Sequence, residues 1–470
     1  MLTVIIAAKR EAVQFGGMFV VMNVLFVVPY APNLVRVRAF QLISNLVRQG
    51  HDLTVATLWT TAEEQADLQR LKDRGPQIVS RRLTKVRAVS NCLRAVPTKA
   101  PLQAVYCWQP ELASDLTTTS AGLRVQHYDV IHVEHLRGAH YGLWLKKHLS
   151  AMGGAARPPI VWDAVDCISH LFSQAAQKSR SLQGRLMTRL ELGRTQRYEG
   201  WLLSQFEQVT VTSPVDKKAL EALWQANGAR RNHQSPDPSG PRWLSVLPNG
   251  VDLGYFTPGE EPRDPATIVL SGKMSYHANV SAALHLVNDI MPRVWAVNPA
   301  ARVVIAGKDP THQIRQLALQ HAGRVEVTGS VPDIRPYLRR ATVAVVPVLY
   351  SAGIQNKVLE AMACATPVIA SPQAISALAA HPGSDLAVAG DEASFAANIL
   401  ALLSDPTQQA QIGQAGRAYV ERQHSWRTVT SQLESVYHRA LEAQRGSAGA
   451  VATPYFVARP ESVAQPAGRP

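Results

Sequence analysis

Short apolar runs rich in β-branched residues alternate along the chain with segments of helical period. In the first half, the runs that predict strands are Asn23–Val28, Asp52–Thr57, Tyr128–Val133, Pro159–Trp162 and Gln208–Thr212. In the second half they are Thr267–Leu270, Val303–Ala306, Val325–Thr328, Val343–Val346 and Val368–Ala370. The alternation is typical of α/β folds, and the almost wholly apolar strands of the second half indicate a parallel sheet with helices on both faces.

Two apolar stripes predict helices that frame this pattern. The first stripe begins at Val35 and ends before Gly50, which stops the helix. The second predicts a helix over 423–445, and its members are Trp426, Val429, Leu433, Val436, Tyr437, Ala440 and Leu441. We therefore expect a first Rossmann-like domain over 22–252 and a second over 253–422.

Composition identifies the segments outside these domains. Residues 226–242 are rich in Gly, Pro and charge, which predicts a flexible insertion, and Ser245–Pro258 is the expected hinge. Residues 446–470 turn to Ala, Pro, Gly and Ser, so we expect a disordered tail. Residues 1–21 lack the apolar region of a signal peptide, and we interpret them as an N-terminal extension before Met22.

The chain has 470 residues, of which 46% are hydrophobic and 18% charged, with a formal net charge of +13. Such an excess favours anionic partners, which could be nucleic acid, acidic lipid or a phosphate-bearing substrate. The four cysteines form no C-x-x-C pair, so we expect them to be reduced in the cytoplasm. The apolar run Met18–Tyr30 is too short to span a bilayer.

Candidate chemistry gathers in Ser351–Ala370, where a loop led by Gly353 enters a helix that carries Lys357 and Glu360. A helix N-terminus offers free N–H groups and a positive dipole to a phosphate, and a carboxylate further along accepts sugar or ribose hydroxyls. The loops after the second-half strands should converge with it, because ligand loops lie at the carboxyl ends of parallel strands. This pattern predicts a nucleotide-sugar site.

Several common motifs do not occur. The sequence has no D-x-D triplet, no G-x-x-x-x-G-K-[ST] and no G-x-G-x-x-G. ATP hydrolysis and dinucleotide redox chemistry are therefore disfavoured. With lysines and a helix dipole available to the diphosphate, we expect no metal and no cofactor. Nucleic-acid binding is disfavoured as well, because the arginines are not interleaved with aromatic residues.

Five segments in order resemble the donor domain of family 4 glycosyltransferases, with greatest similarity to the subgroup of exosortase/PEP-CTERM exopolysaccharide loci. They are LPNGVD (247–252), SGKMSYHAN (271–279), VVIAGKDP (303–310), VTGSVPDIRPYL (327–338) and GIQNKVLEAMACATPVIAS (353–371). The first half resembles that family only through PYAPN (29–33) and WDAVDCIS (162–169). The resemblance implies the GT-B fold: two Rossmann-like domains that face a cleft, the first for the acceptor and the second for the donor, with the last helix crossing back to the first domain.

The resemblance also implies roles on the donor side. Glu360 matches the glutamate that holds the ribose, whereas the family's other glutamate would stand at position 352, which is Ala352 here. Lys273 matches a basic residue aimed at the diphosphate, and Lys357 would replace the second one, whose position holds Asn279. The remaining expected donor contacts lie in the loops, and they are Gly272, Gly307, Gly329, Val331, Gly353, Ile354, Gln355 and Asn356.

First-half candidates are fewer. His132 and His135 lie three positions apart at the end of a strand. We favour His135 as the catalytic group, which would hydrogen-bond the sugar or the acceptor hydroxyl across the cleft. The alternative is that the histidine is structural. Asp163 and Asp166 are candidate acceptor contacts, with helix capping as the alternative, and Arg36 is a third candidate.

We therefore predict a hexosyltransferase that moves a sugar from a nucleoside-diphosphate sugar to a saccharide or lipid-linked acceptor, and the family resemblance implies that it is a retaining enzyme. The alternatives are a sugar-nucleotide epimerase of the same fold and a non-catalytic sugar-nucleotide-binding subunit, which the loss of the paired glutamate would permit. We expect a cytoplasmic protein that associates peripherally with the anionic inner face of the plasma membrane. The basic residues on which this hypothesis rests are Arg36, Arg38, Arg185, Arg189, Arg194 and Arg197.

Overall fold

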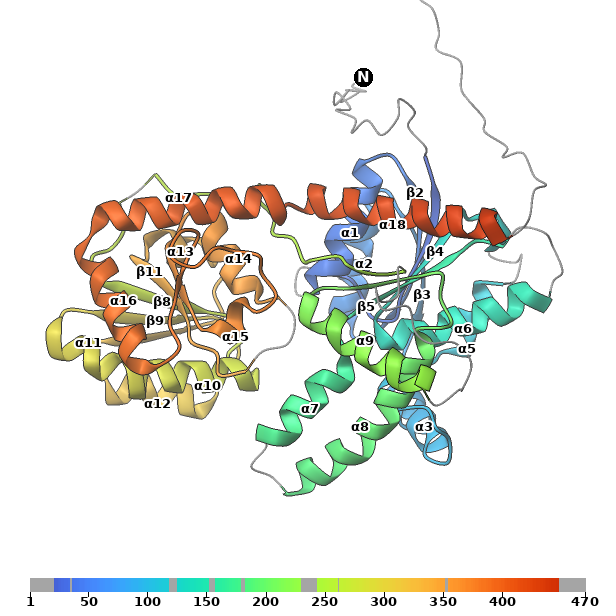
Figure 1. The fold of residues 1–470 in the computed structure, drawn as a ribbon, viewed down its shortest axis with the longest axis horizontal. Helices are drawn as coiled ribbons and strands as arrows, with labels where there is room; N and C mark the ends of the chain where they lie inside the picture. The colour runs from blue at the N-terminus through green and yellow to red at the C-terminus, as the bar shows by residue number, and fades with distance from the viewer. Residues whose placement is uncertain are drawn as a thin grey trace, which may run out of the picture.

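The computed structural model describes residues 21–33, 36–117, 125–151, 157–178, 182–229, 243–260, 262–350 and 354–447. Within them lie two parallel sheets, each in its own domain (Figure 1). The first sheet has the order β3-β2-β1-β4-β5-β6-β7, and the second has the order β10-β9-β8-β11-β12-β13. Neighbouring strands pair in parallel throughout both described sheets, which confirms the α/β class.

The strand bounds follow the apolar runs of the sequence. The strands are β1 (Asn23–Val28), β2 (Asp52–Trp59), β3 (Gln77–Arg82), β4 (Val130–Glu134), β5 (Ile160–Val165), β6 (Gln208–Val211), β7 (Leu244–Val246), β8 (Thr267–Ser271), β9 (Arg302–Ala306), β10 (Val325–Gly329), β11 (Val343–Val346), β12 (Val368–Ala370) and β13 (Ala387–Val388). All ten predicted strands are confirmed, whereas β3, β7 and β13 were not predicted.

Helices connect successive strands and cover the sheets. In the first domain they are α1 (Val37–Arg48), α2 (Ala62–Lys72), α3 (Lys85–Ala95), α4 (Leu102–Val105), α5 (Pro110–Asp115), α6 (His135–Ala151), α7 (Ile168–Lys178), α8 (Leu182–Leu202) and α9 (Pro214–Ala229). In the second they are α10 (His277–His285), α11 (Met291–Val297), α12 (His312–Gln320), α13 (Arg335–Arg340), α14 (Asn356–Ala363), α15 (Pro372–Ile375), α16 (Glu392–Ser404) and α17 (Pro406–Gln423).

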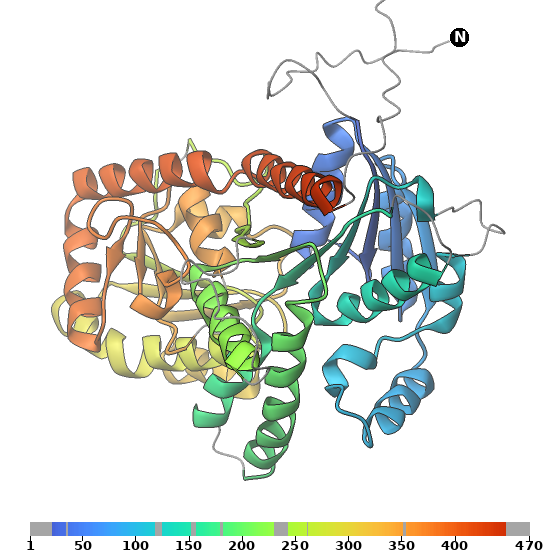
Figure 2. The same ribbon diagram turned by 45° about the vertical axis from the view of Figure 1, so that its right-hand side comes forward.

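The last helix, α18 (Trp426–Ser447), returns to the first domain (Figures 1 and 2). Its predicted stripe is buried in one apolar cluster with the first-sheet residues Val24, Phe26 and Val28 and with α1. The crossing helix of the GT-B architecture is thereby confirmed.

The chain passes between the domains at two places that touch each other. The first is the linker after β7, and the second is the junction between α17 and α18. Val251 forms a bridge with Ser425, and the backbone N–H of Val251 donates to the carbonyl oxygen of His424 at 2.7 Å. The imidazole Nδ1 of His424 lies 2.8 Å from the carbonyl oxygen of Asn249. The two crossings are thus joined by hydrogen bonds.

Three expectations about segments need correction. Residues 226–229 belong to α9, because the Asn227 side chain packs directly on Gly200 of α8, and tertiary packing overrides the local Gly-rich composition. Ser245 and Val246 lie in β7, so the expected hinge begins after them. Residues 446 and 447 extend α18. The extension 1–20, the insertion residues 230–242 and the tail 448–470 lie outside the described residues.

Within the described ranges, no helix is both long and apolar enough to cross a bilayer. The four cysteines are free thiols.

Candidate functional site

Two glycine loops meet at the carboxyl ends of β8 and β9. Gly272 has φ +141° and Gly307 has φ +149°, values that favour glycine. The Gly272 N–H donates to the Ala306 carbonyl at 3.0 Å. A Cβ atom on Gly307 would lie 1.8 Å from the Gly272 carbonyl oxygen, so the two backbones pack with no room for any side chain.

Lys357 lies beside these loops and is almost buried, with 8% of its surface exposed. Its Nζ donates to Oδ1 of Asn279, and Nδ2 of Asn279 donates to the Lys273 carbonyl at 2.9 Å. A Cβ on Gly272 would lie 3.4 Å from the Lys357 Cε atom. Lys357 therefore does occupy the surroundings of Asn279, where the sequence suggested that it replaces a missing cation.

Burial lowers the pKa of Lys357 to about 8, and the nearby Glu360 opposes that change. Glu360 lies one helical turn further along α14 and is half-buried. Burial raises the pKa of Glu360 to about 7, while Lys357 acts to lower it. A ligand that supplies an anion to the lysine and hydroxyl donors to the carboxylate would therefore stabilise the charged forms of both groups.

The N-terminus of α14 points its first N–H groups into the same region. Gln355 is the N-cap residue, and no side chain caps the helix there. Because the leading N–H groups of a helix have no partner within it, those of Asn356 and Lys357 suit an anion. Ile354 is buried just before them. Ala352 and Gly353 lie outside the described residues, so their roles stay predictions.

The other donor candidates lie at neighbouring strand ends. Gly329 closes β10 with φ +69°, and the Thr328 hydroxyl accepts from the Gly307 N–H at 3.3 Å, which places β10 next to the glycine loops. Val331 follows, half-buried. Lys273 is more exposed than Lys357, since 55% of its side chain is accessible, and its Nζ lies 3.9 Å from a carboxylate oxygen of Asp309.

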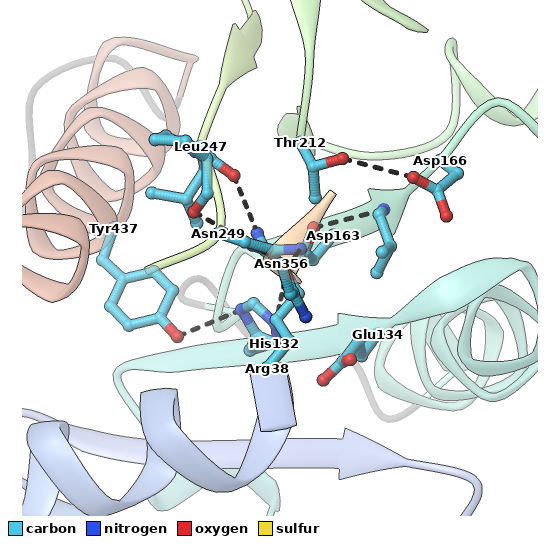
Figure 3. Close-up of polar contacts among 12 residues, drawn as sticks. Arg38, His132, Glu134, Asp163, Asp166, Thr212, Leu247, Asn249, Asn356 and Tyr437 are labelled. Carbon is cyan, nitrogen blue, oxygen red and sulfur yellow. Dashed lines mark hydrogen bonds and ion pairs between the residues drawn. The ribbon is translucent and has the colours of Figure 1, made fainter. Parts of the chain in front are cut away.

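The most extensive polar network of the first domain is centred on Arg38, a buried arginine in α1. The sequence did not predict this network. Arg38 Nε donates to Asp163 at 2.8 Å, and its other nitrogens donate to the carbonyls of Leu247 and Pro248 at 3.1 and 3.2 Å and to Asn249 Oδ1 at 2.9 Å (Figure 3). Arg38 is only 7% exposed, so it cannot serve as the membrane-facing cation that was expected.

Asn249 connects this arginine with the second domain. Its Nδ2 atom donates to Oδ1 of Asn356 at 3.4 Å (Figure 3). Its carbonyl oxygen contacts His424 at the α17–α18 junction. One linker residue therefore touches α1 of the first domain, the start of α14 and the chain's second crossing.

Asp163 and His132 are structural in this arrangement. Asp163 has no exposed surface and anchors Arg38, so it is not an accessible acceptor contact. His132 stacks on Phe26 with ring centroids 4.1 Å apart, and its Nδ1 lies 3.1 Å from the Tyr437 hydroxyl (Figure 3). Burial lowers the pKa of His132 to about 4, so this imidazole is neutral.

His135 and His132 each have one buried ring nitrogen without a hydrogen-bond partner among the described residues, and His135 differs from His132 in its backbone. It begins α6 with φ 67°, a strained value for a residue with a side chain. Its Nδ1 is buried without a hydrogen-bond partner among the described residues. Burial and Arg137 lower the pKa of His135 to about 3. A neutral imidazole with an unused nitrogen suits hydrogen bonding to a hydroxyl, and because His132 Nε2 is unpaired as well, the choice of His135 stays a prediction.

Glu134, next to His135, is a functional candidate that the sequence analysis did not select. Its carboxylate accepts a hydrogen bond from the Tyr30 hydroxyl at 2.5 Å, while Oε2 has no partner among the described residues. Burial and the charge of Asp163 raise the pKa of Glu134 to about 7. Its position between two histidines at a strand end was the available signal.

Arg36 and Asp166 are the remaining candidates of the first domain. Arg36 pairs with Glu64 at 3.1 Å and lies over the Tyr30 ring at 5.0 Å. Asp166 accepts from the Thr212 hydroxyl at 3.2 Å, and burial and Asp216 raise the pKa of Asp166 to about 6. Burial and the charges of Tyr350 and Asp166 raise the pKa of Tyr276 in the second domain.

In the part of the chain that the structure describes, no three His, Cys, Asp or Glu side chains group as metal ligands would. Whether transfer needs a metal stays a prediction.

Residues 265–405 contain the glycine loops and α14, and they match a known family model. That model is "Glycosyl transferases group 1". The group 1 match thus covers the domain in which the donor candidates meet.

Curated relatives cover similar ground. A GDP-mannose-dependent monoacylated alpha-(1-6)-phosphatidylinositol monomannoside mannosyltransferase of Corynebacterium glutamicum is 29% identical over 208 residues, which are 40% of this chain and 55% of that protein. An alpha-maltose-1-phosphate synthase of Mycolicibacterium smegmatis is 27% identical over 271 residues, 51% of this chain and 67% of that protein. The chain therefore spans about half to two thirds of these relatives.

Solved structures share the whole fold. HepE of Anabaena in complex with UDP and glucose has a TM-score of 0.58 at 14% identity, covering 89% of this chain and 99% of that one. A sucrose-phosphate synthase of Thermosynechococcus elongatus has a TM-score of 0.58 at 17% identity, covering 90% of this chain and 100% of that one. The similarity confirms the GT-B fold.

Proposed function

We propose that the chain is a retaining hexosyltransferase that takes a sugar from a nucleoside-diphosphate sugar and passes it to a saccharide or lipid-linked acceptor. One observation carries the proposal: Lys357, Asn279 and the Gly272 and Gly307 loops meet at the uncapped N-terminus of α14. Backbone N–H groups, a helix dipole and a desolvated cation in one place suit a diphosphate.

In this mechanism Lys357 stabilises the charge that develops on the departing diphosphate, because a fixed cation in a water-poor site is most effective where charge grows. Lys273, at the exposed edge, assists from the solvent side. Glu360 accepts hydrogen bonds from the ribose, and Gly329 and Val331 flank the base. His135 reaches the sugar from the first domain with its unused nitrogen.

The names of the relatives support parts of this proposal. The Corynebacterium relative is GDP-mannose-dependent and acts on a phosphatidylinositol monomannoside, which supports a nucleotide-sugar donor and a lipid-linked acceptor. The five motifs over 247–371 support an exopolysaccharide setting. We extend the proposal to peripheral action at an anionic membrane.

The test is a panel of nucleoside-diphosphate sugars assayed for release of the diphosphate, with and without sugar acceptors. For the preferred donor, Lys357→Ala should lower kcat about 100-fold or more. Glu360→Ala should raise the donor KM, and Lys273→Ala should have a smaller effect. The matched control is Lys217→Ala, which removes a lysine of α9 that pairs with Glu221.

The outcomes separate the proposal from its alternatives. Release of diphosphate that depends on acceptor supports transfer. Conversion of the donor to its epimer without an acceptor would instead establish an epimerase. Donor binding without turnover for every acceptor class would establish a binding subunit, and no binding of any donor would refute the site itself.

A further inference from the structure

Helix α3 in the first domain presents an apolar face to solvent. Val86, Val89, Leu93 and Val96 are 80%, 58%, 66% and 61% exposed. Their spacing of three or four residues places them on one side of the helix. Both views show α3 at the outer end of the first domain, opposite α18 (Figures 1 and 2).

The inward face of α3 is the less apolar one, which reverses the usual arrangement. Asn91 and Ala95 are the buried residues of the helix. Asn91 Nδ2 donates to the carbonyls of Tyr106 and Trp108 at 3.0 and 2.7 Å, so a specific polar contact holds this face against the protein. Because Asn91 holds the polar face against the protein, the apolar stripe faces solvent.

Both ends of α3 are also fixed. The Thr84 hydroxyl accepts from the Arg87 N–H at 3.2 Å and caps the N-terminus. At the other end, Arg194 of α8 donates to the carbonyls of Ala95 and Thr98 at 2.7 and 2.6 Å. The helix is thus held in the orientation that exposes the stripe.

The charge around the stripe has one sign. No Asp or Glu occurs between Asp73 and Glu111. Lys85 lies along one edge of the stripe and Arg87 and Arg94 along the other, as helical spacing requires, and Lys99 follows the helix. None of these four side chains has a carboxylate within salt-bridge distance among the described residues. An apolar stripe bordered by unpaired cations matches the interface of an anionic bilayer.

We propose that α3 is the surface by which this protein docks on anionic lipid, with Val86, Val89, Leu93 and Val96 inserted among the acyl chains and the flanking cations at the headgroups. A second copy of the chain fits less well, because packing stripe on stripe would bring the cations of both copies together. The inference extends the proposed function by locating its membrane contact, and it does not depend on the donor site.

The test is flotation of the full chain with phosphatidylcholine vesicles that contain or lack phosphatidylglycerol. Wild type should float only with the anionic vesicles and should be released by salt. The double variant Val89→Asp/Leu93→Asp should lose about tenfold or more of the bound fraction. Lys85→Gln/Arg94→Gln should weaken binding less and reduce its salt dependence.

The matched control is Val297→Asp/Leu319→Asp, which changes two equally exposed apolar residues of the second domain, 69% and 71% exposed, and should float like wild type. Equal flotation of the stripe variant and wild type would overturn the proposal. A wild-type dimer that the stripe variant converts to monomer, with no vesicle binding by either, would assign the face to self-association instead. Diphosphate release should persist in the stripe variant, so this proposal and the proposed function can fail separately.

Discussion

The second domain builds its candidate site from backbone, whereas the first domain builds its own from buried charge. In the second domain, Gly272 and Gly307 bring two loops into contact, and one lysine lies beside them. In the first domain, Arg38 satisfies a fully buried Asp163 and three oxygen atoms of the linker.

The difference has a chemical reason that follows from the proposed function. A diphosphate is the same in every nucleoside-diphosphate sugar, so loops that offer N–H groups suffice to bind it. Acceptors differ in shape, and the side that meets them must combine a stable framework with variable contacts. This accounts for a family match that covers residues 265–405 and does not extend over the first domain.

The largest effect should come from Arg38→Ala. The change leaves Asp163 buried and unpaired, which costs about 3–5 kcal/mol of unfolding free energy. Urea unfolding followed by tryptophan fluorescence measures the loss. The double variant Arg38→Met/Asp163→Asn removes both charges and should be more stable than Arg38→Ala alone. If Arg38→Ala unfolds at the wild-type urea concentration, buried charge does not hold the first domain together.

A smaller effect is expected from Gly307→Ala on the backbone-built side. The added Cβ would overlap the Gly272 carbonyl, so we expect a loss of about 1–3 kcal/mol together with weaker binding of the nucleoside diphosphate by calorimetry. Gly323→Ala is the control, because Gly323 also has positive φ, +80°, but has nothing within 4 Å of the added atom. Equal losses of binding in both variants would show that backbone strain matters and loop contact does not.

The smallest effect is a pH dependence of donor affinity. Below the Glu360 pKa of about 7 the carboxylate is protonated and accepts ribose hydroxyls poorly, and above the Lys357 pKa of about 8 the amine loses its charge. Affinity should therefore peak between these values and fall on either side by at most about tenfold per pH unit. A bound diphosphate favours charged Lys357, so the alkaline fall should lie at higher pH in the complex.

Two variants identify the group that causes each fall in the pH profile of donor affinity. Lys357→Arg should abolish the alkaline fall, because arginine keeps its charge. Glu360→Gln should abolish the acidic fall. Titration of donor affinity across pH by calorimetry reads both, and an alkaline fall that persists in Lys357→Arg would show that another group titrates there.

The sequence predicted the second domain well because its signals are local. Apolar strands, positive-φ glycines and a helix start each occupy a few consecutive residues, and the structure places Lys357 beside Asn279 as expected. β3 was missed for an equally local reason, since Gln77–Arg82 is a partly exposed strand at the sheet edge with little apolar character.

The first-domain network could not be predicted in this way. Arg38 and Asp163 are separated by 125 positions, and Arg38 and Asn249 by 211. No pattern within one segment connects them, so Arg38 was interpreted as one of the cations of a membrane-facing surface. The same limit applies to α3, where only the structure shows that the polar Asn91 faces inward and the valines face out.

The paired crossings at Val251 and Ser425 have a mechanical consequence. Because the two covalent passages are adjacent and hydrogen-bonded to each other, we expect any rotation of one domain against the other to be centred on this pair. Asn249 lies in the first of these passages and makes one contact with each domain. Motions that twist or separate the domains would break the hydrogen bonds between the two passages. Closure over a donor would therefore be confined to a rotation that keeps these bonds intact.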